Sequence, residues 1–257
     1  MDFNLHTHTF RCHHASGKDE DYVIEAIKNG YKTIGFSDHA PYVFPKGHIS
    51  TFRMGTEDTK GYVDSINALK SKYAGAIDIK LGYEVEWYPK FIEKELEYLK
   101  SFGYDYIICG QHYTGSEVED WAKYTGHKTD DVTTLDKYIH QVLLAAISGE
   151  YAYIAHPDLI NFTGDSEIYI EKMGYMLKEL KSLDVPVEFN FLGYTDGRNY
   201  PNDDFWKLAA SEGNRVVIGL DAHHPEVYSD AERLNEMRIK IASFGITPIE
   251  SVNDILK

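Results

Sequence analysis

The chain has little of what secreted and membrane-spanning proteins need. Its two cysteines, Cys12 and Cys109, lie far apart without C-x-x-C spacing, which excludes a disulfide framework and fits a reducing compartment. No apolar run approaches the roughly 20 residues that cross a bilayer. The N-terminus also lacks a basic region followed by a long apolar stretch, so we predict no secretory signal. We therefore expect a cytoplasmic protein without a membrane partner.

Basic residues are also scarce. Lysine and arginine number 26 against 41 aspartates and glutamates, which gives a formal net charge of −15. A negative field of this size repels a phosphodiester backbone, so we predict no nucleic-acid partner. A cluster of bound cations would still attract a phosphate group, because bound ions dominate the field close to them. The excess of acidic residues therefore argues against long nucleic acids but not against a small phosphate ester.

A linker between domains is missing as well. No stretch rich in proline, glycine and serine divides the 257 residues, so we predict one domain over residues 1–257. Two irregular stretches stand out, at residues 40–55 and 114–131. Long loops inside a compact domain are often functional, and we expect these two to lie over one face of the molecule.

What the chain does contain is a regular alternation of two kinds of segment. Short apolar runs predict strands at residues 3–8, 33–38, 78–84, 104–111, 151–156, 187–190 and 216–221. Amphipathic segments predict helices at residues 19–29, 57–73, 91–102, 135–148, 167–183, 203–211 and 231–244. This alternation favours an α/β fold with a parallel sheet, and seven such units close more naturally into a barrel than into an open sheet.

Histidines gather at the ends of the predicted strands. His6 and His8 are two residues apart on the first run, so their side chains share a face and can hold one ion. Later runs end in His39, His112, His156 and His223. In barrels of this kind the chemistry lies at the C-terminal ends of the strands. We therefore predict a metal site there, because a histidine without a function has no reason to prefer one end.

Two carboxylates extend the predicted set. Glu84 ends the third run, and its two oxygens can bridge two cations, which an imidazole cannot do. Glu86 follows on the same alternating face, either to orient a ligand or to be solvated. Asp221 and His223 repeat the i, i+2 spacing on the last run. Glu84 and Asp221 are therefore the predicted catalytic carboxylates.

Several neighbouring residues have more than one reading. Of the adjacent pair His13 and His14, we expect His14 to fold back as a ligand, although the register of this pair is ambiguous. Cys12 is expected to be a packed thiol. Asp158 either orients His156 or caps a helix. Other histidines lack the strand-end position and are expected to be exposed polar residues, namely His48, His127 and His140.

Arginines are the natural partners for a phosphate group. Arg198, after the sixth run, is our first choice as catalytic and substrate-binding clamp, because a planar guanidinium matches two phosphate oxygens. Arg53, in the first long loop, is the second choice for substrate binding. Arg11 is the third, because it lies close in sequence to the predicted ligands.

These motifs resemble the PHP (polymerase and histidinol phosphatase) family. The resemblance covers residues 3–228 and rests on the H-x-H pair, His14, and residues 37–41, 82–86, 111–112, 156–157 and 221–223. Further stretches are similar to the histidinol-phosphate phosphatases within that family, at residues 35–41, 52–54, 187–190, 197–198 and 200–201.

The resemblance implies a fold, a metal centre and a reaction. The fold is a distorted (βα)7 TIM-like barrel, and the centre holds three divalent ions of zinc, iron or manganese. The implied ligand sets are His6, His8, Glu84 and Asp221; Glu84, His112 and His156; and His14, His39 and His223. The implied enzyme belongs to histidine biosynthesis and hydrolyses L-histidinol phosphate to L-histidinol and phosphate. A metal-bridging hydroxide would attack phosphorus in line.

Three alternatives compete with this interpretation. A PHP phosphoesterase can act on another small phosphate ester or a nucleotide. An amidohydrolase barrel also begins with H-x-H, but it typically has eight strands and often a modified lysine as its bridge. A regulatory or storage module would bind metal without turnover. The residues do not indicate the metal, the general acid or the oligomeric state, whereas phosphate release from a panel of esters separates the three classes.

Overall fold

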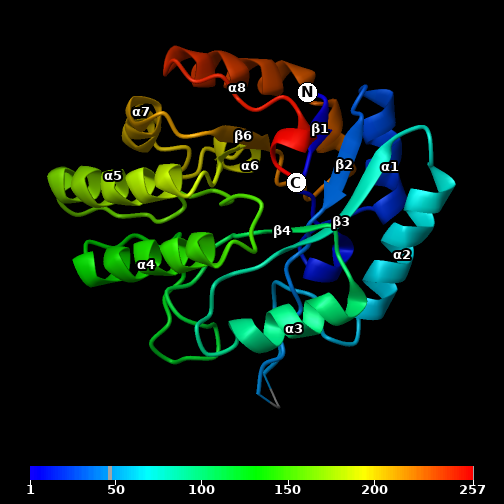
Figure 1. Ribbon diagram of the computed structural model, residues 1–257, viewed down its shortest axis with the longest axis horizontal. Helices are drawn as coiled ribbons and strands as arrows, with labels where there is room; N and C mark the ends of the chain where they lie inside the picture. Colours follow the sequence, from blue (N-terminus) through cyan, green and yellow to red (C-terminus); the bar gives the residue numbers. More distant parts are fainter. Residues whose placement is uncertain (46–47, 257) are drawn as a thin grey trace.

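The computed structural model describes residues 1–45 and 48–256, and its short parallel strands form a ring inside a layer of helices (Figure 1). The strands are β1 (Phe3–Asn4), β2 (Thr33–Phe36), β3 (Asp78–Glu84), β4 (Tyr106–Ile108), β5 (Val187–Asn190) and β6 (Val216–Gly219). Apart from the first residues of β3, their residues are buried. This is expected for a parallel sheet that is covered on both faces.

Single bridges join two sheets into the closed ring. β1, β2, β3 and β4 are neighbours in that order, and β5 pairs with β6. Ile154 bridges Cys109 on one side and Val187 on the other, so the segment around Ile154 lies between β4 and β5. Thr7 bridges Ala222, which connects the ends of β1 and β6. The described part of the chain therefore forms a distorted, parallel α/β barrel, and this fold prediction is confirmed.

Several strands are shorter than predicted. The predicted strand at residues 151–156 is reduced to the two bridges of Ile154. The last predicted strand stops at Gly219, and the chain turns through a left-handed backbone at Asp221, where φ is 50°. His156 has a φ of 30° and ends the fifth segment in the same way. The single domain over residues 1–257 stays a prediction, which the bridge between the first and last strands supports.

Helices pack around the ring in chain order (Figure 1). The longer ones are α1 (Asp19–Lys28), α2 (Thr59–Lys72), α3 (Ile92–Phe102), α4 (Val132–Ser148), α5 (Ser166–Ser182), α7 (Asp203–Glu212) and α8 (Ala231–Ser243). Asp131 caps α4 by accepting the Thr133 N–H at 3.0 Å, and Gly149 ends that helix with a φ of 70°. No helix in the described residues is long and apolar enough to span a bilayer.

Four short helices were not predicted: η1 (Phe10–Cys12), α6 (Phe191–Thr195), η2 (Pro225–Ser229) and η3 (Val252–Asp254). The side chain of Asn190 starts α6 by accepting the Gly193 N–H at 2.8 Å. Segments of three to five residues are too short to show a helical period. Three of them nevertheless position the site, because η1, α6 and η2 follow β1, β5 and β6.

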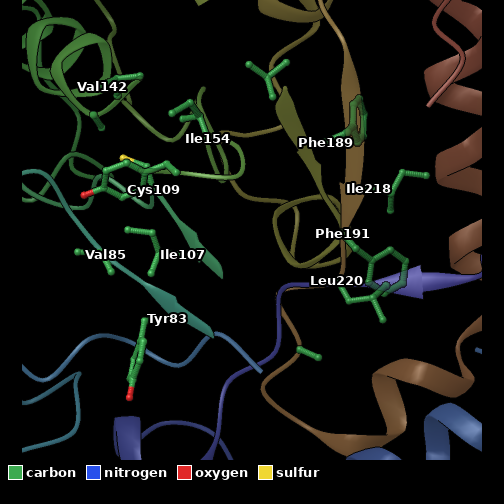
Figure 2. Close-up of a cluster of buried hydrophobic side chains, with 14 of the residues drawn as sticks. Tyr83, Val85, Ile107, Cys109, Val142, Ile154, Phe189, Phe191, Ile218 and Leu220 are labelled. Carbon is green, nitrogen blue, oxygen red and sulfur yellow. The ribbon is translucent and has the colours of Figure 1, made fainter. Parts of the chain in front are cut away.

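Two buried clusters hold the ring together. In the larger cluster, Val142 of α4 packs near Cys109 and Ile154, while Phe189 and Ile218 lie on the neighbouring strands (Figure 2). The smaller cluster combines residues of β1, β4, the segment around Ile154 and β6. Because β1 and β4 are not neighbours, this second cluster fills the inside of the ring. The Tyr106 ring in this cluster has room because residues 35 and 82 are glycines. A Cβ atom at Gly35 or Gly82 would overlap the ring.

One buried carboxyl group lies outside the site, on α3. Glu95 accepts the Val43 N–H through Oε2 at 3.0 Å, and its Oε1 has no hydrogen-bond partner among the described residues. Burial raises the pKa of Glu95 to about 7. A raised carboxyl pKa means that the folded state holds a proton which the unfolded state has released, so ionisation destabilises the fold as pH rises toward 7.

We therefore predict that Glu95→Gln makes the free energy of unfolding less dependent on pH. The free energy of unfolding of the variant, relative to that of the parent, should rise by about 3 kcal/mol between pH 5 and pH 8, at 1.36 kcal/mol per unit of pKa shift. Urea unfolding across this range measures it, with the exposed Glu93→Gln on the same helix as the control. An advantage that stays constant with pH would contradict the assignment.

Candidate metal centre and active site

The predicted ligands meet at one end of the ring. A cavity of about 880 Å³ opens there, and its floor and walls include His14, His39, Glu84, His112, His156, Asp221 and His223. His6 and His8 lie beneath it and are fully buried. All nine predicted ligands therefore belong to one cluster at the C-terminal ends of the strands. Their roles as ligands remain proposals.

Glu84 lies at the centre of this cluster. Its Oε1 is 2.8 Å from His156 Nε2, 3.6 Å from His6 Nε2 and 3.7 Å from His112 Nε2. Its Oε2 lies 2.9 Å from His39 Nδ1 and 3.6 Å from His8 Nε2. Burial opposes ionisation, but His112, His39 and His6 hold the pKa of Glu84 well below its usual range. The two oxygens of one ionised carboxylate thus face two groups of imidazoles.

Asp221 faces His6 and His8, the two histidines that follow β1. Its Oδ1 is 3.1 Å from His8 Nε2 and 3.5 Å from His6 Nε2, and the two Nε2 atoms are 3.2 Å apart. The left-handed backbone at Asp221 directs the carboxylate inward. For a residue other than glycine such a backbone costs about 1–3 kcal/mol, which is typical of residues held in place for function.

A third group of imidazoles lies nearer the opening. The ring of His14 is 4.6 Å from that of His223 and 5.4 Å from that of His39, measured between centroids. Both His13 and His14 are exposed, but His14 lines the cavity, whereas His13 ends η1 with a φ of 69° and does not. The structure therefore brings His14, and not His13, to the cluster.

The donor set fits divalent cations. His223 Nε2 is buried without a hydrogen-bond partner among the described residues. Two nitrogens that each lie about 2.1 Å from a tetrahedral zinc ion are about 3.4 Å apart, close to the 3.2 Å between His6 and His8. Although burial opposes protonation, Glu188, Asp221 and Glu84 raise the pKa of His6 to about 10. The cluster thus attracts positive charge, which metal ions supply.

Three further carboxylates orient the imidazoles from behind. Glu188 Oε1 lies 2.7 Å from His6 Nδ1, Glu86 Oε1 lies 3.0 Å from His112 Nδ1, and Asp38 Oδ1 lies 3.4 Å from His8 Nδ1. A carboxylate on one ring nitrogen fixes the tautomer and leaves the other nitrogen free to bind metal. Sequence reasoning assigned no role to Glu188 or Asp38. For Glu188 the available signal was an acidic residue inside a predicted strand, whereas Asp38 lies beyond the end of β2.

Two glycines make room for the carboxylates. A Cβ atom at Gly110 would overlap Glu84 Oε1, and a Cβ atom at Gly219 would overlap Glu188 Oε1. Neither glycine has a positive φ, so space, and not backbone freedom, requires glycine at these positions. Both were missed in the sequence, because the approach of a carboxylate from another strand leaves no local signal.

The arginines divide between the cavity and the protein interior. Arg198 lines the cavity, and Asp196 and Tyr200 hold its guanidinium at 3.0 Å and 3.1 Å. The side chain of Arg53 is fully buried in ion pairs with Glu86 and Glu117 and does not reach the cavity. The prediction that Arg53 contacts a phosphate group is therefore corrected.

The remaining expectations have mixed outcomes. Arg11 does not reach the cavity either, because it binds Asp19 at 2.9 Å. Asp158 accepts from the Asn202 N–H at 2.6 Å and the Trp206 indole at 2.9 Å, so it holds the start of α7 and does not orient His156. Burial raises the pKa of Cys12, as expected for a packed thiol. His140 and His127 are both exposed, as predicted, and His127 also lines the cavity.

Comparison with known proteins tests the predicted resemblance to the PHP family. Residues 4–191 match the PHP domain. This chain belongs to the PHP domain family. It is 31% identical over 242 residues to the probable histidinol-phosphatase of Deinococcus radiodurans, and the match covers 91% of each protein. It is 25% identical to the probable histidinol-phosphatase of Schizosaccharomyces pombe, over 88% of this chain and 81% of the relative.

A solved structure supports the PHP fold. The histidinol phosphate phosphatase of Lactococcus lactis, complexed with zinc, L-histidinol and phosphate, has a TM-score of 0.73 against this chain. The two sequences are 21% identical, and the superposition covers 96% of this chain and 95% of the other. At this identity the similarity establishes the fold, whereas the ligands of that enzyme are properties of that enzyme alone.

The space at Gly110 yields a test of this PHP site. In Gly110→Ala the new methyl group should displace Glu84, and a shift of about 1 Å should lower kcat about 100-fold and reduce bound metal. The control is Gly61→Ala on α2, where a Cβ atom meets nothing within 4 Å and alanine favours the helix. Elemental analysis and phosphate release measure both effects. Unchanged metal content in Gly110→Ala would show that Glu84 is not a ligand.

Proposed function

We propose that this protein is a metal-dependent phosphomonoesterase that hydrolyses L-histidinol phosphate to L-histidinol and phosphate. The observation that carries the proposal is the carboxylate of Glu84 among imidazoles at the floor of a cavity whose wall presents Arg198. Membership of the PHP family and the relatives named histidinol-phosphatase, one of them matching 91% of the chain, support it. Such an enzyme belongs to histidine biosynthesis, and the predicted cytoplasmic location stays a prediction.

The metal centre is proposed to hold three divalent ions of zinc, iron or manganese. The proposed ligand sets are His6, His8, Glu84 and Asp221; Glu84, His112 and His156; and His14, His39 and His223. Groups of donor atoms within 4.8 Å of one another support them in part, including His6–His8–Asp221 and His6–Glu84–His156. When bound, such ions neutralise phosphate oxygens and lower the pKa of coordinated water.

Arg198 binds the phosphate group in this proposal. Its side chain is 39% exposed, lies on the cavity wall and is held by Asp196 and Tyr200, so its direction is set before substrate arrives. A fixed guanidinium stabilises charge on two phosphate oxygens without reorganising during the reaction. The pKa of Arg198 is raised further above its usual range, in spite of burial, by Tyr200 and Asp221. Its positive charge is therefore permanent.

Asp221 acts on the water side of the reaction. Burial opposes its ionisation, but His6, His8 and His223 hold the pKa of Asp221 well below its usual range. A carboxylate that stays ionised cannot protonate a leaving alkoxide, but it accepts a hydrogen bond from an attacking water and so orients it. Protonation of the alkoxide therefore falls to another group or to solvent.

The cavity also suits an amine-bearing substrate. Asp196 and Asp230 line it but are paired with Arg198 and Arg233, at 3.0 Å in each case. Glu226 lines the same cavity and forms no ion pair within the described residues, which leaves its carboxylate for an ammonium group. Aromatic rings on the wall offer surface to an imidazole, from Phe52, Tyr113, Tyr124 and Tyr200.

The first test is substrate preference on protein of known metal content. We expect kcat/KM for L-histidinol phosphate to exceed that for an aryl phosphate by about 100-fold, which is roughly 2.7 kcal/mol of discrimination. A nucleoside monophosphate completes the panel. Equal rates on all three esters would leave a phosphomonoesterase with another physiological substrate. Metal binding without turnover of any ester would contradict the proposal.

A second test concerns the phosphate contact. Arg198→Ala should lower kcat/KM by about 10–100-fold, since a charged hydrogen bond contributes about 1.5–3 kcal/mol, and should leave bound metal unchanged. The effect should be the same for every phosphate monoester, because all share the group that Arg198 binds. Arg215→Ala, far from the cavity and paired with Asp184, is the control. Unaltered kinetics in Arg198→Ala would exclude it as the clamp.

A further inference from the structure

We propose that Arg53 is a positioning residue of the metal centre, which fixes His112 through Glu86 and fastens both long loops to it. The inference rests on the proposed metal centre, since it assigns His112 a ligand role. In this proposal Arg53 does not make the phosphate contact that was predicted from the sequence, but acts on His112 through Glu86. The evidence is a chain of buried contacts that runs from two loops to one imidazole.

The first contact is a two-pronged ion pair. Arg53 Nη2 lies 2.8 Å from Glu86 Oε1, and Arg53 Nη1 lies 3.1 Å from Glu86 Oε2. Both side chains have an exposed fraction of 0%. A parallel pair of N–H···O bonds fixes the plane of the carboxylate as well as its position. A buried charge of either sign would be costly without the other, so each holds its partner in place.

The second contact transmits this position to the centre. Glu86 Oε1, which accepts from Arg53 Nη2, also lies 3.0 Å from His112 Nδ1. A carboxylate paired with a guanidinium accepts a hydrogen bond from Nδ1–H and leaves the lone pair on Nε2, which lies 3.7 Å from Glu84 Oε1.

The remaining bonds of the guanidinium fasten the two long loops. Nη1 also donates to the carbonyl oxygen of Ala40 at 2.9 Å, at the start of the first loop. Nε donates to Glu117 Oε1 at 2.6 Å, in the second loop. Ser50 of the first loop donates to the other oxygen of Glu117 at 2.9 Å. One side chain thus connects both loops with the orientation of His112.

An aromatic contact adds to this arrangement. The Phe52 ring covers the guanidinium at 4.3 Å and lies 5.4 Å from the His39 ring. Phe52 also forms part of the cavity wall, whereas Arg53 does not. Lysine cannot reproduce the pattern, because an ammonium group is a point charge without a planar fork. The geometry therefore requires arginine at this position for a reason unrelated to phosphate binding.

The test separates positioning from simple structural support. In Arg53→Lys and Arg53→Met, we expect affinity for one of the bound ions to fall by about 10–100-fold, as for other residues that orient ligands. Bound metal is counted by elemental analysis after dialysis against a graded chelator. The absorption spectrum of the cobalt(II)-substituted protein should also change, because a reoriented His112 alters the ligand field of the ion that it binds. kcat should fall more than KM rises.

Arg215→Lys is the control, since Arg215 is paired with one carboxylate, Asp184, outside the cavity. It should change neither the metal count nor the cobalt spectrum. If Arg53→Met does not fold, Glu86→Gln tests the same contacts from the other side and should also weaken one ion. Unchanged metal affinity and cobalt spectrum in Arg53→Lys or Glu86→Gln, with only stability reduced, would overturn the proposal. Parent protein that binds no ion would refute the metal centre itself.

Discussion

The ionised carboxylate of Glu84 lies fully buried among imidazoles, and the rest of the site depends on how its charge is balanced. Taking a carboxylate out of water is costly unless opposite charge or hydrogen bonds replace the lost solvent. Here the nearest partners of Glu84 are ring nitrogens that lie 2.8–3.7 Å from its oxygens. In the absence of metal, His6, His8 and His112 balance this charge, because nearby carboxylates raise their pKa values in spite of burial; bound ions would take over this role. Charge balance therefore links the fold to its metal.

That requirement explains features that otherwise look unrelated. Gly110 and Gly219 lack side chains, which leaves space inside the ring for the carboxylates of Glu84 and Glu188. His156 and Asp221 accept left-handed backbones, which direct them toward the cavity as their strands end. Glu188 and Glu86 hold imidazoles from behind at 2.7 Å and 3.0 Å. Each feature costs stability by itself, and the packed clusters of the ring and its helices supply the compensating burial.

The sequence predicted the parts of this site that depend on strand direction. Parallel strands bring their C-terminal ends together, so ligands at run ends had to converge whatever the loops did. His6, His8 and Glu84 follow from that rule. Contacts between distant segments did not: nothing near Arg53 indicates that Glu86 and Glu117 enclose it, and the burial of Glu188 depends on a glycine on another strand. The choice of His14 over His13 also needed the backbone of η1.

The closure of the ring has a consequence for how the protein is made. Thr7 and Ala222 are bridged although more than two hundred residues separate them, and the proposed first ligand set joins residues 6, 8, 84 and 221 across the same seam. Contacts of such long sequence separation form late and slowly. During translation the first strand therefore emerges with its two histidines long before their partners exist. The proposed first ligand set can therefore be complete only after Asp221 has been synthesised.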